Sequence, residues 1–264
     1  MGKILRILKA FWRGQPRYAY PAQDISVGDS EFHLVGSIHM GTQGMMPLPA
    51  ALQARLARAD ALIVEADITS GASPFGESEI CPPLRTRLTA EELCRLERLC
   101  ETVAIAPEAI DTLSGWQIAL MLQAQQAQRL GLRTEYGIDM QLLNAARAQQ
   151  KAVIELEGPA AQLALLQALP DNGLSLLRDT LEHWDTNARL LQTMMSWWLE
   201  RPPRGTAMLP STFNNALNDV LMLQRNQRWS EMLPALPAGN YVVAVGALHL
   251  YGDGNLPELL KNNG

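Results

Sequence analysis

The stretches Phe32-His-Leu-Val-Gly-Ser-Ile-His39 and Tyr241-Val-Val-Ala-Val-Gly-Ala-Leu-His249 follow one pattern, an apolar run that ends in Gly-x-x-His. A short run of β-branched and aromatic residues bounded by glycine predicts a buried strand. In an open α/β sheet, ligands bind at the carboxyl ends of the strands, which is where both histidines lie. A histidine at a core edge is often only structural, but the shared context of His39 and His249 favours a common site. His33, inside the first strand, is expected to be structural.

Two other predicted strands end in carboxylates. Glu65 follows the apolar run at residues 61–64, and Asp67 is a weaker candidate on the same side of that strand. A carboxylate at a strand end can ligate a cation or accept the second N–H of a ligating histidine. Glu155 and Glu157 close a later strand, and they share a face by the alternation of a strand. The strand pattern therefore does not separate these two glutamates.

Composition limits the class of protein. Hydrophobic residues make up 47% of the 264 residues and charged residues 19%, as in an ordinary globular protein. A net charge of −5, an isoelectric point near 5.4 and the lack of a basic stripe indicate that nucleic acid is not a partner. The three cysteines are odd in number and show no Cys-x-x-Cys spacing, which argues against a disulfide framework and a structural zinc site. Free cysteines fit a reducing compartment, so we expect a cytoplasmic protein.

The N-terminal segment is distinct from the rest of the chain. Residues 1–13 are basic and amphipathic, which allows weak contact with a membrane surface, but they lack the apolar core and cleavage site of a signal peptide. No window of about 18 apolar residues predicts a transmembrane helix. We assign residues 1–22 to this segment and a linker, and residues 23–264 to a single α/β domain.

Helical patterns alternate with the predicted strands, which favours an α/β fold. A Gly-, Ser- and Pro-rich loop at residues 69–85 follows the strand that ends at Glu65, and it is a candidate lid. Asp139 opens a later helix, where we favour a role as its cap over an approach to a metal ion. Apolar residues at helical spacing predict helices at residues 49–60, 89–103, 116–130, 174–199 and 213–232.

The order of these motifs resembles the TraB/GumN family from about residue 30 to the C-terminus. The residues that carry the resemblance are Gly36-Ser-Ile-His39, Leu62-Ile-Val-Glu65-Ala-Asp67, Tyr136-Gly-Ile-Asp139, Val153-Ile-Glu-Leu-Glu157, Arg225-Asn226 and Val245-Gly-Ala-Leu-His249-Leu-Tyr-Gly252. The resemblance implies a central, mixed and mostly parallel sheet flanked by many helices, like that of erythromycin esterases and ChaN, with a large helical insertion. The family includes the Tiki proteins, which are metal-dependent peptidases with paired Gly-x-x-His motifs.

The resemblance also implies a site. His39, His249 and Glu65 are the expected ligands of a divalent metal ion, which could be manganese, cobalt, zinc or iron. Such an ion lowers the pKa of a bound water. Glu65, Glu157 and Arg225 are the expected catalytic residues: Glu157, or Asp139 in its place, as general base, and Arg225 to clamp a substrate carboxylate or stabilise an oxyanion.

The leading hypothesis from the sequence is a metal-dependent hydrolase, peptidase-like, that acts on a peptide or small-molecule substrate. One alternative is a metal-free, esterase-like hydrolase in which His39 or His249 activates water. Another is a non-catalytic regulatory protein that binds a peptide or haem. Ser37 is not expected to act as a nucleophile, because it does not lie in a Gly-x-Ser-x-Gly elbow.

Overall fold

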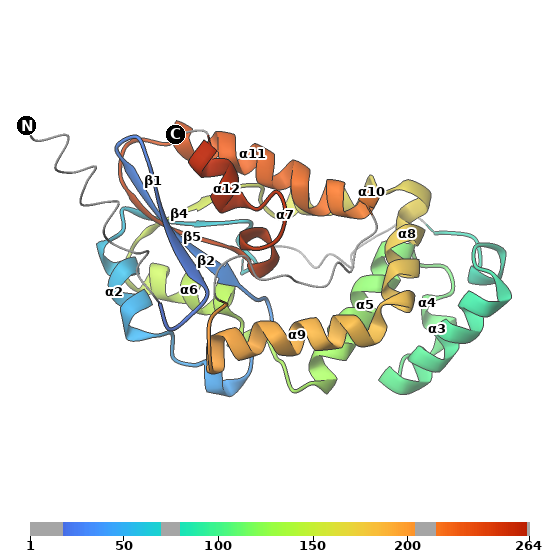
Figure 1. The fold of residues 1–264 in the computed structure, drawn as a ribbon. Helices are drawn as coiled ribbons and strands as arrows, with labels where there is room; N and C mark the ends of the chain where they lie inside the picture. The colour runs from blue at the N-terminus through green and yellow to red at the C-terminus, as the bar shows by residue number, and fades with distance from the viewer. Residues whose placement is uncertain (1–17, 70–79, 204–214, 263–264) are drawn as a thin grey trace, which may run out of the picture.

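A five-stranded sheet forms the centre of the protein, with helices packed around it (Figure 1). The computed structural model describes residues 18–69, 80–203 and 215–262. The strand order in the sheet is β1-β2-β5-β3-β4. The strands are β1 (Ala22–Val27), β2 (Ser30–Ser37), β3 (Ala61–Val64), β4 (Ala152–Glu155) and β5 (Asn240–Gly246).

The two strands that lead to the Gly-x-x-His histidines are direct neighbours, as the sequence predicts. β2 pairs with β5 in parallel, and Gly36 and Ser37 lie opposite Val245 and Gly246. β5 then pairs with β3, and β3 with β4, both in parallel. β3 is thus parallel to β2, as expected, although β5 lies between them. The carboxyl ends of these four strands consequently meet at one edge of the sheet.

β1 is a strand that the sequence analysis did not predict. It pairs with β2 in an antiparallel hairpin whose two-residue turn contains Gly28 at φ +58. Positive φ at this position suits glycine, and such turns match the twist of a hairpin. The alternation of apolar Ile25 and Val27 before Gly28-Asp29 is the sequence pattern that indicates this strand and its turn. The hairpin is the antiparallel part of an otherwise parallel sheet.

The helices agree with the predicted ranges near the start of the chain and depart from them later. Thr89 caps α3 with a capping box, in which its side chain accepts from Glu92 N and Glu92 accepts from Thr89 N. The α-helices of the described residues are α2 (Ala50–Arg58), α3 (Ala90–Val103), α4 (Pro107–Ile110), α5 (Gly115–Arg129), α6 (Ile138–Ala148), α7 (Pro159–Gln167), α8 (Pro170–Glu182), α9 (Trp184–Leu199), α10 (Asn215–Asn218), α11 (Gln224–Met232) and α12 (Leu256–Asn262).

The single helix predicted at residues 174–199 is wrong. The chain turns at His183, whose backbone (φ −103, ψ 21) is not helical, so that α8 and α9 are separate helices. Continuous apolar spacing does not reveal such a break, because both helices bury a face of the same period. The helix predicted at residues 213–232 also changes form, since a π-helical segment at Asp219–Leu223 separates α10 from α11.

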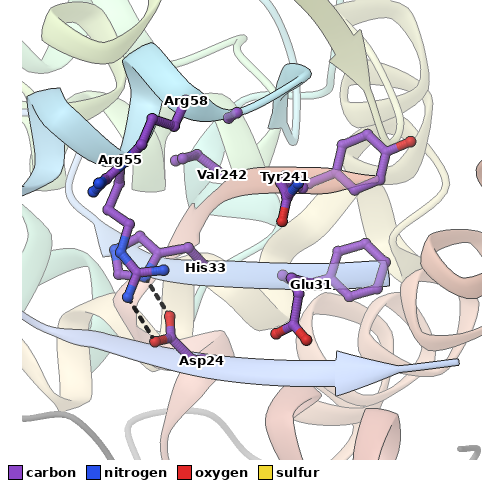
Figure 2. A pocket seen from close by; sticks show the side chains of 10 residues that line it. Asp24, Glu31, His33, Arg55, Arg58, Tyr241 and Val242 are labelled. Atoms are coloured by element: carbon purple, nitrogen blue, oxygen red, sulfur yellow. Dashed lines mark hydrogen bonds and ion pairs between the residues drawn. The ribbon is translucent and has the colours of Figure 1, made fainter. Parts of the chain in front are cut away.

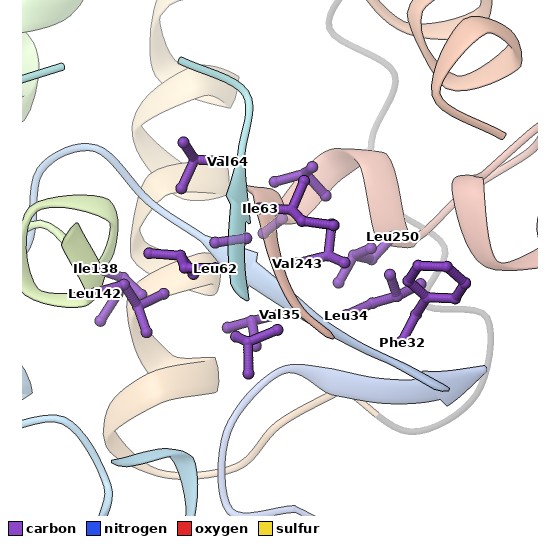
Figure 3. Packing of buried hydrophobic residues seen from close by; sticks show 14 of the residues in the cluster. Phe32, Leu34, Val35, Leu62, Ile63, Val64, Ile138, Leu142, Val243 and Leu250 are labelled. Atoms are coloured by element: carbon purple, nitrogen blue, oxygen red, sulfur yellow. The ribbon is translucent and has the colours of Figure 1, made fainter. Parts of the chain in front are cut away.

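The main hydrophobic core packs on both faces of the sheet (Figure 3). Leu62 of β3 points toward Ile138 and Leu142 of α6, whereas Ile63 points to the opposite side, where Leu250 lies. This is the alternation expected of a strand that is buried on both faces. α2 and α6 cover one face, and α11 and α12 lie on the other (Figure 1).

A second hydrophobic cluster lies away from the sheet, among α3, α5 and α8. Gly115 and Gly173 allow α5 and α8 to come very close, because a Cβ on Gly115 would lie 2.6 Å from the carbonyl carbon of Gly173. These helices belong to the segments inserted between β3 and β5. Among the described residues, no helix is long and apolar enough to cross a membrane. The predicted membrane-contacting segment and most of the candidate lid lie outside the described residues.

We predict that Leu62→Ala lowers the free energy of unfolding by about 2–5 kcal/mol, because the leucine is fully buried between the sheet and α6. Leu199→Ala is the matched control. That side chain is 48% exposed, so its loss should change stability by less than about 0.5 kcal/mol. Urea unfolding followed by circular dichroism measures both, and equal losses would contradict the described core.

Candidate functional site

The residues singled out by the sequence meet at the carboxyl edge of the sheet. Glu65 directly follows β3, and Glu157 lies two residues after β4. His39 lies two residues beyond β2, and His249 lies in a 3-10 turn, Ala247–Leu250, that follows β5. Arg225 reaches this edge from the first turn of α11.

Arg225 is the centre of the cluster. Its Nε donates to Glu157 Oε1 at 2.9 Å, and its Nη2 donates to Glu157 Oε2 at 2.8 Å and to Glu65 Oε2 at 2.5 Å. Its Nη1 donates to Leu221 O and contacts His249 Nε2, both at 3.2 Å. A guanidinium has five N–H groups, so all of its donors are engaged. The side chain is 12% exposed.

Glu65 is held from three sides. In addition to Arg225, its Oε1 accepts from Gly246 N at 2.6 Å and its Oε2 accepts from Gln162 Nε2 at 3.2 Å. A Cβ on Gly246 would lie 3.4 Å from this carboxylate and 3.5 Å from the His249 ring. These are ordinary van der Waals distances, so the contact itself is the backbone N–H of Gly246 donating to Glu65.

His249 is buried and neutral. Its Nδ1 lies 2.7 Å from Asn226 Oδ1, and the amide nitrogen of Asn226 donates to Gly254 O at 2.9 Å. Asn226 Oδ1 thus faces His249 as an acceptor, so Nδ1 carries the proton and Nε2 accepts from Arg225. Trp229 packs against both partners, with its ring 4.5 Å from the imidazole of His249 and 4.7 Å from Cζ of Arg225. Burial lowers the pKa of His249 to about 4.

His39 has the opposite environment. Its side chain is 62% exposed, and its Nδ1 forms an ion pair at 2.8 Å with Oδ2 of Asp139, which is buried. Among the described residues, no group forms a hydrogen bond with its Nε2. The charge of Asp139 raises the pKa of His39 to about 9, so the imidazole is protonated at neutral pH. His39 and Asp139 form a dyad whose outer nitrogen is open.

Backbone contacts create this dyad. Ile138 N donates to Ile38 O at 2.9 Å, and a Cβ on Gly137 would lie 2.2 Å from the carbonyl oxygen of His39. Gly137 is therefore needed for the chain that precedes α6 to lie against the end of β2. The cap of α6 is Gly137, with no side-chain cap bond, so Asp139 does not cap the helix as the sequence analysis favoured.

The charges of the Arg225 cluster and of the His39–Asp139 dyad shift the pKa values of their members. Burial alone would raise the pKa of Glu65, but its interactions with His249 and Arg225 lower it to about 2. Burial similarly opposes the charge of Arg225, and the carboxylates of Glu65 and Glu157 raise its pKa above the ordinary value. Glu65 also contributes to the raised pKa of His39. The site at neutral pH therefore holds a charged Arg225 between charged carboxylates, next to a charged His39.

The arrangement does not fit a metal held by His39, His249 and Glu65. Glu65 and the Nε2 of His249 both contact Arg225, and Nδ1 of His39 is paired with Asp139. In the described part of the chain, no group of three or more His, Cys, Asp or Glu residues is placed to hold a metal ion. The expected metal stays a prediction: of its three expected ligands, Glu65 and His249 contact Arg225, and only Nε2 of His39 lacks a partner among the described residues.

Neighbouring candidates lie outside the cluster. Glu155 accepts from Asp67 N, and Asp67 pairs with Arg147 at 2.6 Å, so both belong to a more peripheral ion-pair network. The structure thus selects Glu157 over Glu155. His183 lies at the break between α8 and α9, 4.0 Å from Asp179.

His33 belongs to a separate polar network near the start of β5 (Figure 2). Its Nδ1 lies 2.7 Å from Asp24 Oδ1 and its Nε2 lies 3.0 Å from the hydroxyl of Tyr20, while Arg55 donates to Asp24 Oδ2 at 2.9 Å. A pocket of about 250 Å³ adjoins this network. Burial opposes ionisation of Asp24, yet the hydrogen bonds from His33 and Tyr18 lower its pKa. Both nitrogens of His33 have partners, in agreement with a structural role.

The comparisons with known proteins identify the family of the chain. The model of the TraB/PrgY/gumN family matches residues 22–264. This chain belongs to the TraB/PrgY/gumN family. It is 54% identical to the uncharacterized protein YbaP of Escherichia coli (strain K12) over 263 residues, which cover 98% of this chain and 99% of that protein. YbaP of Shigella flexneri matches with the same identity and coverage. We found no solved structure that matches the chain.

Asn226, Trp229 and Gln162 are site residues of this family member to which the sequence analysis gave no role. Asn226 had a signal in the Arg225-Asn226 pair, which is one of the motifs that carry the family resemblance. Trp229 lies one helical turn after Arg225, a spacing that also predicts ordinary core packing. No sequence signal connects Gln162 with Glu65, since the contact depends on where α7 begins.

We predict that Asp139→Asn lowers the pKa of His39 from about 9, since Asp139 is the main cause of the raised value. A raised pKa of a histidine stabilises the fold at low pH, and that contribution is lost as pH rises through the folded-state value. The variant should therefore be less stable than the parent at pH 6, and the difference should shrink above pH 9. NMR titration of the imidazole and urea unfolding measure the two effects. Glu135→Gln removes an equal charge at an exposed position and should leave the pKa of His39 near 9.

We predict that Gly137→Ala separates His39 from Asp139, because the added Cβ would overlap the His39 carbonyl oxygen. The forced shift should lower the free energy of unfolding by about 1–3 kcal/mol and the pKa of His39 with it. Gly44→Ala is the control, since its Cβ would meet only the end of the Leu199 side chain, at 3.3 Å, and the oxygen of Thr42, at 3.9 Å. A Gly137→Ala protein with the stability of the parent would contradict the close approach.

Proposed function

We propose that this chain is a hydrolase in which His39, held by Asp139, activates water for attack on a carbonyl group. The observation that carries the proposal is the dyad itself: an exposed imidazole whose Nδ1 is paired with a buried carboxylate at the carboxyl edge of the sheet. A carboxylate in this position holds the ring in one orientation and stabilises its charged form. The open Nε2 is then the group that exchanges a proton with water.

The reaction follows from these two residues. The neutral form of His39 accepts a proton at Nε2 from a water molecule, whose oxygen attacks the carbonyl carbon of the substrate. The imidazolium then returns the proton to the leaving oxygen or nitrogen, and the bond to the leaving group breaks. One water is consumed, and His39 ends in the state in which it began.

The contacts of His249 and Arg225 differ from those expected of residues that act directly on water or substrate. His249 has both nitrogens engaged and a pKa of about 4, so its contacts do not leave it free to act on water. Arg225 has no unused N–H for a substrate in this conformation. Of the two histidines that the sequence analysis considered for metal-free hydrolysis, the geometry favours His39. The roles first expected of Glu65, Glu157 and Arg225 in catalysis stay predictions.

The proposed reaction requires a substrate with a carbonyl group that water can attack. A general base with water as nucleophile serves esters and activated amides, which are the esterase-like and peptidase-like alternatives. The test therefore uses a panel of p-nitrophenyl esters together with a mixture of short peptides, in protein treated with chelator. Release of nitrophenolate and the appearance of peptide fragments by mass spectrometry report the two substrate types.

We predict that His39→Asn lowers hydrolysis by about 10²–10⁴-fold, the usual contribution of a general base. In the parent the rate should rise with pH up to about 9, because only neutral His39 accepts a proton. Asp139→Asn should move this rise to lower pH and reduce the maximal rate.

His183→Asn is the matched control for the reaction of a surface histidine with an activated ester, since His183 is partly exposed and its ion pair is with Asp179 and not with the dyad. It should retain the parent's rate. Hydrolysis that persists in His39→Asn, or a rate that does not change between pH 6 and 9, would refute the proposal.

A further inference from the structure

We propose that Arg225 is the resident cation of this site and that its guanidinium excludes a divalent metal ion from a latent site formed by Glu65, Glu157 and His249. The inference concerns the cluster and not the dyad, and it does not depend on hydrolysis by His39. Its starting point is the mismatch between the metal ligands expected from the sequence and the contacts that two of those ligands make.

Through two of its nitrogens, the guanidinium fills the space between three groups that could otherwise bind a cation; as placed around it in the described part of the chain, these groups do not form a metal site. The guanidinium lies within hydrogen-bond distance of Glu65 Oε2, Glu157 Oε2 and His249 Nε2, at 2.5, 2.8 and 3.2 Å. Two carboxylates and the lone pair of a neutral imidazole are a common ligand set for a divalent ion. The second nitrogen of His249 is bound by Asn226, a partner that orients a ligating histidine in metal sites.

Burial explains why one cation must be present. The side chains of Glu65 and Glu157 are only 9% and 8% exposed, and two buried carboxylates without a positive partner are strongly unfavourable. Arg225 satisfies both with one charge. A divalent ion placed among the same oxygens would meet the positive guanidinium at close range, so the two cations compete for the site.

Arg225 is also fixed in place by groups other than the acids. Leu221 O accepts from its Nη1, and Leu221 lies in the π-helical segment just before α11. The guanidinium packs on the Trp229 ring at 4.7 Å. Single π-helical turns within helices are frequent at functional sites. Withdrawal of Arg225 would break these contacts as well as the ion pairs, which favours the guanidinium over a metal ion from solution.

We predict that Arg225→Met creates a Co²⁺ site. Methionine retains much of the apolar stem that packs on Trp229 and removes the charge and all five N–H groups. Titration of the chelator-treated variant with Co²⁺, followed by visible absorption and calorimetry, should show one ion per chain bound at least tenfold tighter than in the parent protein.

Two further variants locate the ion. Arg225→Met combined with Glu157→Gln should lose the gain, because one ligand oxygen pair no longer carries a charge. Arg228→Met is the matched control: Arg228 is 59% exposed and only 3.5 Å from Glu157, so it removes a nearby arginine without freeing Glu65 or His249. This control should bind Co²⁺ as weakly as the parent.

The outcomes are decisive without any measurement of turnover. Parent protein that binds Co²⁺ as tightly as Arg225→Met would overturn the proposal, because it would show that the guanidinium does not exclude the ion. A gain that survives Glu157→Gln would also overturn it. Circular dichroism tests whether Arg225→Met folds. If it does not, Arg225→Lys, which keeps the charge but forms fewer bonds, should bind Co²⁺ no better than the parent, and tight binding by this variant would count against the proposal.

Discussion

The bidentate pairing of Arg225 with Glu157, extended to Glu65, is the interaction on which the site depends. Three strand ends and one helix meet where a cation is needed to keep two carboxylates ionised in a buried position. The same guanidinium contacts the lone pair of His249, and burial together with this neighbouring charge keeps the pKa of the imidazole low. Removal of this single charge would leave Glu65, after β3, and Glu157, after β4, as buried carboxylates that repel each other.

The site consequently has two halves with different properties. Around Arg225 the guanidinium, both carboxylates and the His249 ring are hydrogen-bonded and largely buried, whereas Nε1 of Trp229 has no partner among the described residues. The imidazole of His39 is exposed and its Nδ1 pairs with Asp139, while its Nε2 has no hydrogen-bond partner among the described residues.

Much of the fold followed from local patterns. Apolar runs predicted β2, β3, β4 and β5, and helical spacing predicted α2, α3 and α5 closely. β2, β3 and β5 are mostly buried and the helices bury one stripe, whereas β4 is only partly buried. β1 was not recognised, since its apolar alternation is short. The break at His183 was not recognised either, because the apolar period continues on both sides of it.

The sequence by itself determined the family, the α/β class and the edge of the sheet at which the polar residues gather, because strand ends are encoded in short apolar runs followed by glycine and histidine. Only the tertiary structure decided which side chains pair. Gly137 lets α6 present Asp139 to His39, and the end of β4 presents Glu157 and not Glu155 to Arg225. These choices depend on backbone contacts between elements far apart in the chain, and local residue patterns carry no information about the distances between them.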